Sequence, residues 1–248
     1  MFVFIKKEKK KSLKNFVKAN CKFQRNLIKH VKAILHMRKS LIIPLIIIFI
    51  SFIAGAVLYY YMPEKMASHW NIAGEVDGYM PKFWGLFLMP IISLVMFFLF
   101  IFLIKIDPLK KNVQKFRKYY DGFITVFIAF FFYLYVLTIF WSLKFEFNMV
   151  QFLFPAFAAL FYYIGILVEK SKRNWFIGIR TPWTLSSDAI WDKTHKLGGK
   201  MFKAVSFLAL LGIVFPRQAF FFIIPSLIFV SIYLVIYSYL EYKKKSRK

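Results

Sequence analysis

Side chains able to do chemistry gather in two polar stretches, residues 62–82 and residues 172–199. The first stretch contains His69, Glu75 and Asp77, whose imidazole and carboxylate groups could jointly hold a divalent cation. Such residues occur in many polar loops, however, and no spacing here fixes a metal geometry. Its prolines and glycines favour a compact cap made of turns instead.

In the second stretch, Asp188, Asp192 and His195 recur at the i, i+4 and i+7 positions of a helix and therefore share one face. That face could form a metal or proton-sensing triad. It could also be a solvated face on which Asp192 pairs with Lys196. The second interpretation is the commoner one for charges at this spacing.

Catalytic patterns are missing from the sequence. There is no H-E-x-x-H zinc motif and no pair of aspartates inside an apolar run, and neither stretch assembles a nucleophile with its base. The single cysteine, Cys21, excludes an intramolecular disulfide and a cysteine-rich zinc site. We therefore predict a protein that is not an enzyme and that needs neither a metal nor a cofactor.

The elements that position these stretches are apolar. The chain of 248 residues is 60% hydrophobic, which exceeds the content of an ordinary soluble domain. Six runs lack Asp, Glu, Lys and Arg, and five of them are long enough to cross a bilayer as helices. These runs are residues 40–63, 83–104, 122–143, 147–168, 204–216 and 218–240. The fifth run is short, but Lys203 and Arg217 at its ends can reach the two interfaces.

The basic residues give an independent test of this topology. Counted from the N-terminus, the segments between runs carry 13, 2, 6, 1, 8, 1 and 5 Lys and Arg residues. High and low counts alternate, and cytoplasmic loops carry the excess. We therefore predict an all-α, polytopic integral protein of the cell membrane with six transmembrane helices and both termini in the cytoplasm. Residues 62–82 then lie outside, and residues 172–199 lie inside.

Residues 1–39 form a separate segment, in which apolar residues recur at helical spacing among lysines and arginines. We predict a basic amphipathic helix on the anionic inner leaflet. Docking to a protein or a nucleic acid is the alternative, although nothing in the segment reads bases and we expect no direct nucleic-acid binding. Residues 40–121 form the first two spans with the outer loop, and residues 122–248 form the other four.

Two strings in the polar stretches resemble a known family. The sequence RNWFIGIRTPWTLSSDAIWDKTHKLGG, residues 173–199, resembles the signature of the SdpI immunity proteins. The sequence PEKMASHWNIAGEVDGY, residues 63–79, resembles the N-terminal domain that often precedes it. The resemblance implies a multispanning membrane protein that protects its producer against a secreted toxic peptide. It also implies that a cytoplasmic transcriptional repressor could be drawn to the membrane.

The resemblance and the loop chemistry together select candidate binding residues. In the outer loop these are His69, Asn71, Gly74 and Asp77. They could form a recognition cap for a peptide, or Asn71 and Asp77 could only close turns. In the inner loop the candidates are Arg173, Asn174, Gly178, Arg180, Thr181, Pro182, Trp183 and His195.

The inner loop supports further local predictions. Ser187 is a favourable N-cap and Gly198 a favourable end for a helix of about ten residues. We expect Arg180 to clamp a helix end or an acidic partner through two parallel hydrogen bonds. Trp175, Trp183 and Trp191, with the two arginines, are expected to hold the loop against lipid headgroups.

Three functions remain open from the sequence. The first is toxin immunity or signalling without catalysis, with membrane lipids, a secreted peptide toxin and a cytoplasmic regulator as the expected partners. The second is a small-molecule permease, although no ionisable residue lies deep in the five long runs. The third is a membrane enzyme, which the missing catalytic patterns disfavour.

Overall fold

The structure is a computed structural model that describes residues 39–247. The predicted amphipathic helix of residues 1–39 lies outside the described residues, apart from Lys39. The chain divides into two compact units, Met1–Ile42 and Ile43–Lys248. The second unit contains both candidate binding loops and is described below.

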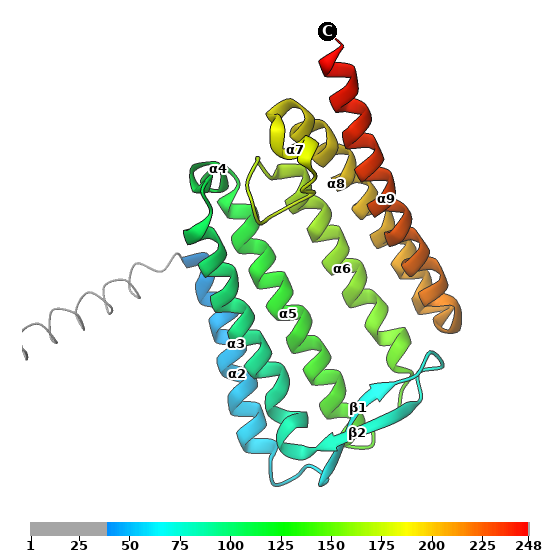
Figure 1. The fold of residues 1–248 in the computed structure, drawn as a ribbon. Coiled ribbons are helices and arrows are strands. Elements are labelled where there is room, and N and C mark those ends of the chain that lie inside the picture. The colour runs from blue at the N-terminus through cyan, green and yellow to red at the C-terminus, as the bar shows by residue number, and fades with distance from the viewer. Residues whose placement is uncertain (1–38, 248) are drawn as a thin grey trace, which may run out of the picture. The chain divides into compact units, whose positions relative to one another are not determined.

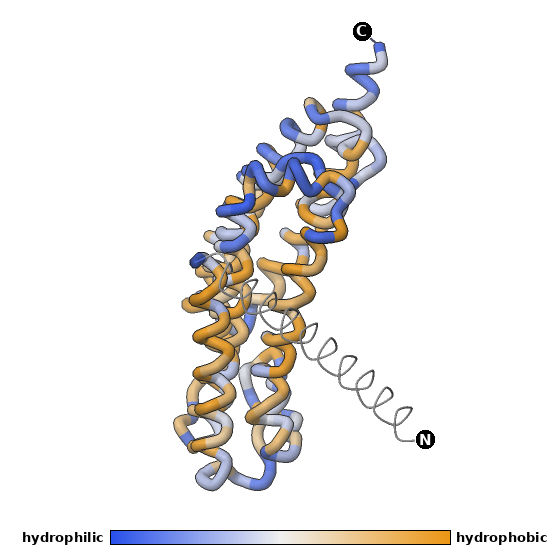
Figure 2. The backbone as a smooth tube through the Cα atoms, turned by 90° about the vertical axis from the view of Figure 1, so that its left-hand side faces the viewer, coloured by the Kyte–Doolittle hydropathy of each residue, from blue (hydrophilic) through white to orange (hydrophobic). Residues whose placement is uncertain are grey.

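Within residues 39–247, six helices are long and apolar enough to cross a membrane, which confirms the predicted number of spans. They are α2 (Ile42–Leu58), α3 (Lys82–Ile106), α5 (Arg117–Ser142), α6 (Met149–Lys170), α8 (Asp188–Val214) and α9 (Ala219–Ser246). The short helices are η1 (Lys39–Leu41), α4 (Lys110–Lys115), α7 (Pro182–Ser186) and η2 (Pro216–Gln218). Hydrophobic residues occupy the middle of the bundle and hydrophilic residues its two ends (Figure 2).

Contacts pass through the bundle from α3 to α5, from α5 to α6, from α6 to α8 and from α8 to α9. The same order is visible in Figure 1. Helix α2 joins through a buried hydrogen bond, in which the hydroxyl of Tyr135 on α5 donates to the carbonyl of Ser51 at 3.2 Å. Because neighbouring helices hold the backbone, Pro90, Pro155 and Pro225 are tolerated inside α3, α6 and α9.

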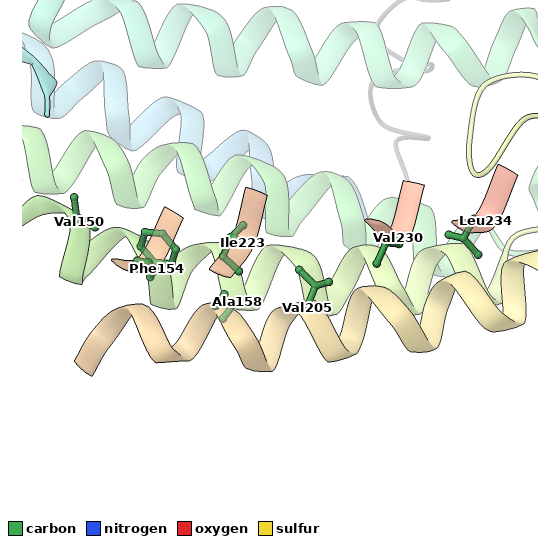
Figure 3. Packing of buried hydrophobic residues seen from close by; sticks show 9 residues of the cluster. Val150, Phe154, Ala158, Val205, Ile223, Val230 and Leu234 are labelled. Carbon is green, nitrogen blue, oxygen red and sulfur yellow. The ribbon is translucent and has the colours of Figure 1, made fainter. Parts of the chain in front are cut away.

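Figure 3 shows the apolar cluster between α6, α8 and α9. Its buried members come from all three helices: Val150, Phe154, Ala158, Val205, Ala209, Ala219, Ile223, Val230 and Leu234. The last three spans therefore pack as a continuous unit that supports the inner loop.

The prediction that a helix ends at Gly198 is wrong. Helix α8 continues from Asp188 through Gly198 and Gly199 to Val214 and includes the short fifth apolar run. The glycines allow close packing instead: a Cβ atom on Gly199 would lie 2.7 Å from the carbonyl oxygen of Gly165 on α6. The contact between the two helices offsets the intrinsic cost of glycine in a helix.

A β-hairpin adds to the helical architecture that the sequence predicts. Strands β1 (Lys65–Trp70) and β2 (Val76–Pro81) pair antiparallel, with irregular register around His69. Met66 on β1 is fully buried, and it packs in an apolar cluster with Leu86 of α3 and Tyr135 of α5. The compact outer cap is thus a hairpin anchored on two spans.

Candidate functional site

The candidate residues lie at opposite ends of the bundle. The four from residues 62–82 lie on the hairpin, and we call this end the hairpin end (Figure 1). The eight from the inner loop lie on residues 171–187, here called the motif loop, or at the start of α8. We call this end of the bundle the motif end. The charge pattern predicts the hairpin end outside the cell and the motif end in the cytoplasm.

Asn174 organises the first half of the motif loop. Its side chain is fully buried and makes four hydrogen bonds within the loop. The amide nitrogen donates to the carbonyls of Lys172 and Ile177, and the amide oxygen accepts from the backbone N–H groups of Phe176 and Ile177. Because the whole hydrogen-bonding capacity of Asn174 is used here, its side chain serves the shape of the loop.

His195 connects the loop to α8. Its Nε2 atom accepts from the backbone N–H of Ile179 at 2.8 Å, so this nitrogen carries no proton, and its Nδ1 atom donates to the carbonyl of Trp191 at 2.8 Å. The imidazole is therefore neutral, and it stacks on the indole of Trp191 with 3.8 Å between ring centroids. Gly178 has a φ of 113°, and a Cβ atom there would collide with His195.

The second half of the loop forms α7 through a capping box between Thr181 and Thr184. Thr184 is fully buried, and its hydroxyl donates to the carbonyl of Ile179 at 2.8 Å. The hydroxyl of Thr181 lies 3.0 Å from that of Ser238 on α9. Pro182 occupies the first turn of α7, where its missing N–H costs nothing.

The loop between α3 and α5 braces the motif loop from the other side. Asp107, which is 2% exposed, accepts from the backbone N–H of Trp175 at 3.0 Å and from that of Leu109 at 2.6 Å. The side chain of Asn112 donates to the carbonyl of Arg173 at 2.9 Å. Sequence reasoning missed both residues. The Asp-Pro pair that ends α3 was the signal for Asp107, because an aspartate there can cap the following turn.

The charged residues of the motif end pair differently from the prediction. Asp192 contacts Lys172 at 3.0 Å rather than Lys196, since the motif loop folds back along α8. Asp188 contacts Arg173 at 2.6 Å. His195 is buried and is not part of a charged face. Ser187 stands at the N-cap of α8, but its side chain makes no capping bond and accepts from Lys245 instead.

The three tryptophans have different surroundings, so the prediction that all of them contact headgroups needs correction. Trp191 is fully buried, and its indole N–H donates to the carbonyl of Ser171 at 3.1 Å. Trp183 packs against Tyr239 of α9 with 5.1 Å between ring centroids. Trp175 is 51% exposed and is the most exposed of the three tryptophans.

Arg180 is exposed beside Trp175. Its Nη1 atom donates to the carbonyl of Trp175 at 2.8 Å, and within residues 39–247 no carboxylate forms a salt bridge with it. This carbonyl belongs to the motif loop, between α6 and α7, so the predicted contact of Arg180 with a helix end is wrong. The remaining donors of the exposed guanidinium are available to an acidic group.

The four candidates at the hairpin end lie within one hairpin but do not form a single cluster of contacts. His69 on β1 pairs with Asp77 on β2 through Nδ1 and Oδ1, and both side chains are largely exposed. Asn71 closes the turn by accepting from the N–H of Glu75 at 3.0 Å. Asp77 does not close a turn. Gly74, with a φ of 85°, completes the tip of the hairpin.

The tip of the hairpin is fixed to α6. Asn148, the N-cap of α6, donates to the carbonyl of Ala73 at 3.0 Å, and a Cβ atom on Gly74 would collide with it. Sequence reasoning missed Asn148, since a helix cap does not reveal which distant carbonyl its amide reaches. In the described residues, 39–247, no three His, Cys, Asp or Glu side chains are grouped so that they could hold a metal ion.

Comparison with known proteins finds a matching family model for a segment at each end of the bundle. Residues 46–94, which include the hairpin, match a domain of unknown function, DUF1648. Residues 170–238 match the SdpI/YfhL protein family. The resemblance predicted from the two strings is therefore confirmed. The SdpI/YfhL segment contains the complete motif loop, α8 and most of α9.

A curated relative extends the similarity over both segments. The chain is 25% identical over 210 residues to the immunity protein SdpI of Bacillus subtilis (strain 168). The aligned region covers 84% of this chain and 98% of that protein. No solved structure matches the chain. Together with the six spans, these similarities show a multi-pass membrane protein that is similar to immunity protein SdpI.

Proposed function

We propose that this chain is a non-catalytic membrane immunity protein that protects the cell carrying it against a secreted peptide toxin. The observation that carries the proposal is the similarity to immunity protein SdpI over almost the full length of that relative. The buried bonding of His195 and Asn174 supports it, because side chains committed to internal hydrogen bonds are poorly placed to attack or protonate a substrate.

The hairpin is the part that first meets a secreted peptide. His69 and Asp77 are exposed on neighbouring strands, so their side chains are accessible to a ligand. A carboxylate on a rigid hairpin can bind a cationic or donor-rich group without ordering a loop first. Asn71, Gly74 and Asn148 then hold that surface in shape.

The motif loop offers a surface to a cytoplasmic regulator. Trp175 and Arg180 are adjacent and exposed on a loop that is held rigid from within by Asn174. Exposed Trp and Arg are the residue types that dominate protein interfaces. An acidic surface on the regulator would satisfy the guanidinium of Arg180.

Survival of a sensitive host tests the proposal. The chain is expressed in cells challenged with a panel of secreted peptides, and an inert membrane protein at equal abundance is the control. Protection against at least one peptide is the expected result. Equal killing of both strains by every peptide, with the chain present in the membrane, contradicts the proposal.

A further inference from the structure

A basic pocket lies between α8 and α9 at the motif end. It has a volume of about 630 Å³ and is lined by Ile190, Lys193, Glu241, Lys244, Lys245 and Arg247, together with Ala189. Four cationic side chains face one carboxylate, which leaves positive charge in excess.

Partners inside the protein hold the cationic groups in place. The carboxylate of Glu241, whose side chain is 10% exposed, contacts the Nζ atom of Lys193 at 2.6 Å and that of Lys244 at 3.6 Å. The Nζ atom of Lys245 donates to the hydroxyl of Ser187 at 2.9 Å. An anion entering the pocket therefore meets lysines that are already oriented, and it loses little free energy to their ordering.

The surroundings place the pocket at the depth of lipid headgroups. The last apolar run of the sequence ends at Leu240, directly before Glu241. Tyr239 and Tyr242 are each partly exposed there, as expected of aromatic residues at a membrane interface. Leu240 and Ile236 lie one and two helical turns before Lys244 on α9, and both are about half exposed. A ligand with an anionic headgroup and acyl chains fits a basic pocket that is followed along α9 by exposed apolar side chains.

We propose that this pocket binds the phosphate of an anionic phospholipid whose acyl chains lie along α9. Basic pockets between transmembrane helices on the cytoplasmic side bind such headgroups in other membrane proteins. The lysines contact the phosphate, and Ile236 and Leu240 contact the chains. The pocket thereby ties the end of α9 to the start of α8, which carries the motif loop.

Native mass spectrometry of the purified full chain in a neutral detergent measures lipid binding. Phosphatidylglycerol is titrated against phosphatidylcholine with the same acyl chains. The test variant is Lys193→Gln with Lys245→Gln, and the matched control is Lys110→Gln with Lys111→Gln, which removes the same charge from α4. With about 1 kcal/mol per lysine near an anionic lipid, we expect the test variant to lose about thirtyfold in affinity for phosphatidylglycerol.

The control pair should change the affinity by less than about twofold, because its lysines lie outside the pocket. Equal losses in both variants, or equal binding of the two lipids by the unchanged protein, would overturn the proposal. Displacement of the lipid by glycerol 1-phosphate at matching concentration would identify a soluble-anion site instead. If the double variant fails to fold, Lys244→Gln, whose side chain is 75% exposed, replaces it with the same expected direction.

Discussion

The hairpin and the motif loop are both polar and lie at opposite ends of one helical bundle, yet they use polar side chains in opposite ways. At the motif end, Asn174 and Thr184 of the motif loop and His195 of α8 are fully buried and bond to the backbone around them. In the hairpin, the side chains of His69 and Asp77 are 71% and 46% exposed and bond to each other. Polar side chains therefore stabilise the conformation of the motif loop from its interior, whereas on the hairpin they are exposed to contact a ligand.

This contrast separates stability from recognition. A buried amide or imidazole that loses its partner leaves other buried groups unsatisfied, and the folded state pays the full desolvation cost. An exposed pair contributes little to stability because water replaces the lost contact. Substitution of a buried polar residue at the motif end should then lower the amount of folded protein. Substitution of His69 or Asp77 should alter function while the amount of folded protein stays normal.

The largest expected difference between the two ends concerns the side of the membrane. After Cys21 is replaced, Ile72→Cys on the hairpin should react with an impermeant thiol reagent in intact cells, and Ser186→Cys on the motif loop should not. Both side chains are exposed, so access to the side chain is matched. Labelling of position 186 without lysis would contradict the predicted topology.

On stability, Asn174→Ala should have the strongest effect. The substitution removes four hydrogen bonds and strands buried backbone groups of Ile177, so we expect a loss of about 3 kcal/mol or more. Thermal unfolding in detergent measures it, with Asn112→Ala as a control that removes one bond of the same loop. A melting temperature within the error of the unchanged protein would show that the network contributes nothing.

His195→Phe should cost less, about 1–3 kcal/mol, because one partly buried N–H, that of Ile179, loses its acceptor while stacking on Trp191 remains available. His195→Gln is the control variant, because the amide oxygen of the glutamine can accept a hydrogen bond from the N–H of Ile179. Greater stability of the glutamine variant than of the phenylalanine variant supports the hydrogen bond. The reverse order would assign the role of His195 to ring packing.

The sequence predicts the spans more completely than the loops. Charge-free runs and alternating basic loops locate all six helices, because length and hydropathy decide membrane crossing. They do not predict that α8 continues through Gly198, since glycine ends some helices and permits close packing in others. Asp107 and Asn148 act on carbonyls or N–H groups more than 60 residues away in sequence, which no local pattern encodes.

Arg180→Lys should leave stability within about 0.5 kcal/mol, because the exposed guanidinium has one internal contact, the carbonyl of Trp175. If Arg180 binds an acidic regulator through two parallel hydrogen bonds, the lysine weakens that complex although its charge is kept. Capture of the regulator with the full chain as bait, at equal membrane abundance, measures the effect. Equal capture by both proteins would leave Arg180 without a bidentate role.

The central claim is that the hairpin recognises the toxin while the buried polar residues of the motif loop maintain the fold, and Asp77→Asn tests it most directly. Asparagine keeps the shape and a hydrogen bond to His69 but removes the charge, so stability should change by less than about 0.5 kcal/mol. Membrane abundance and survival under toxin are measured on the same cells. We predict normal abundance with lost protection; full protection at normal abundance would contradict the claim.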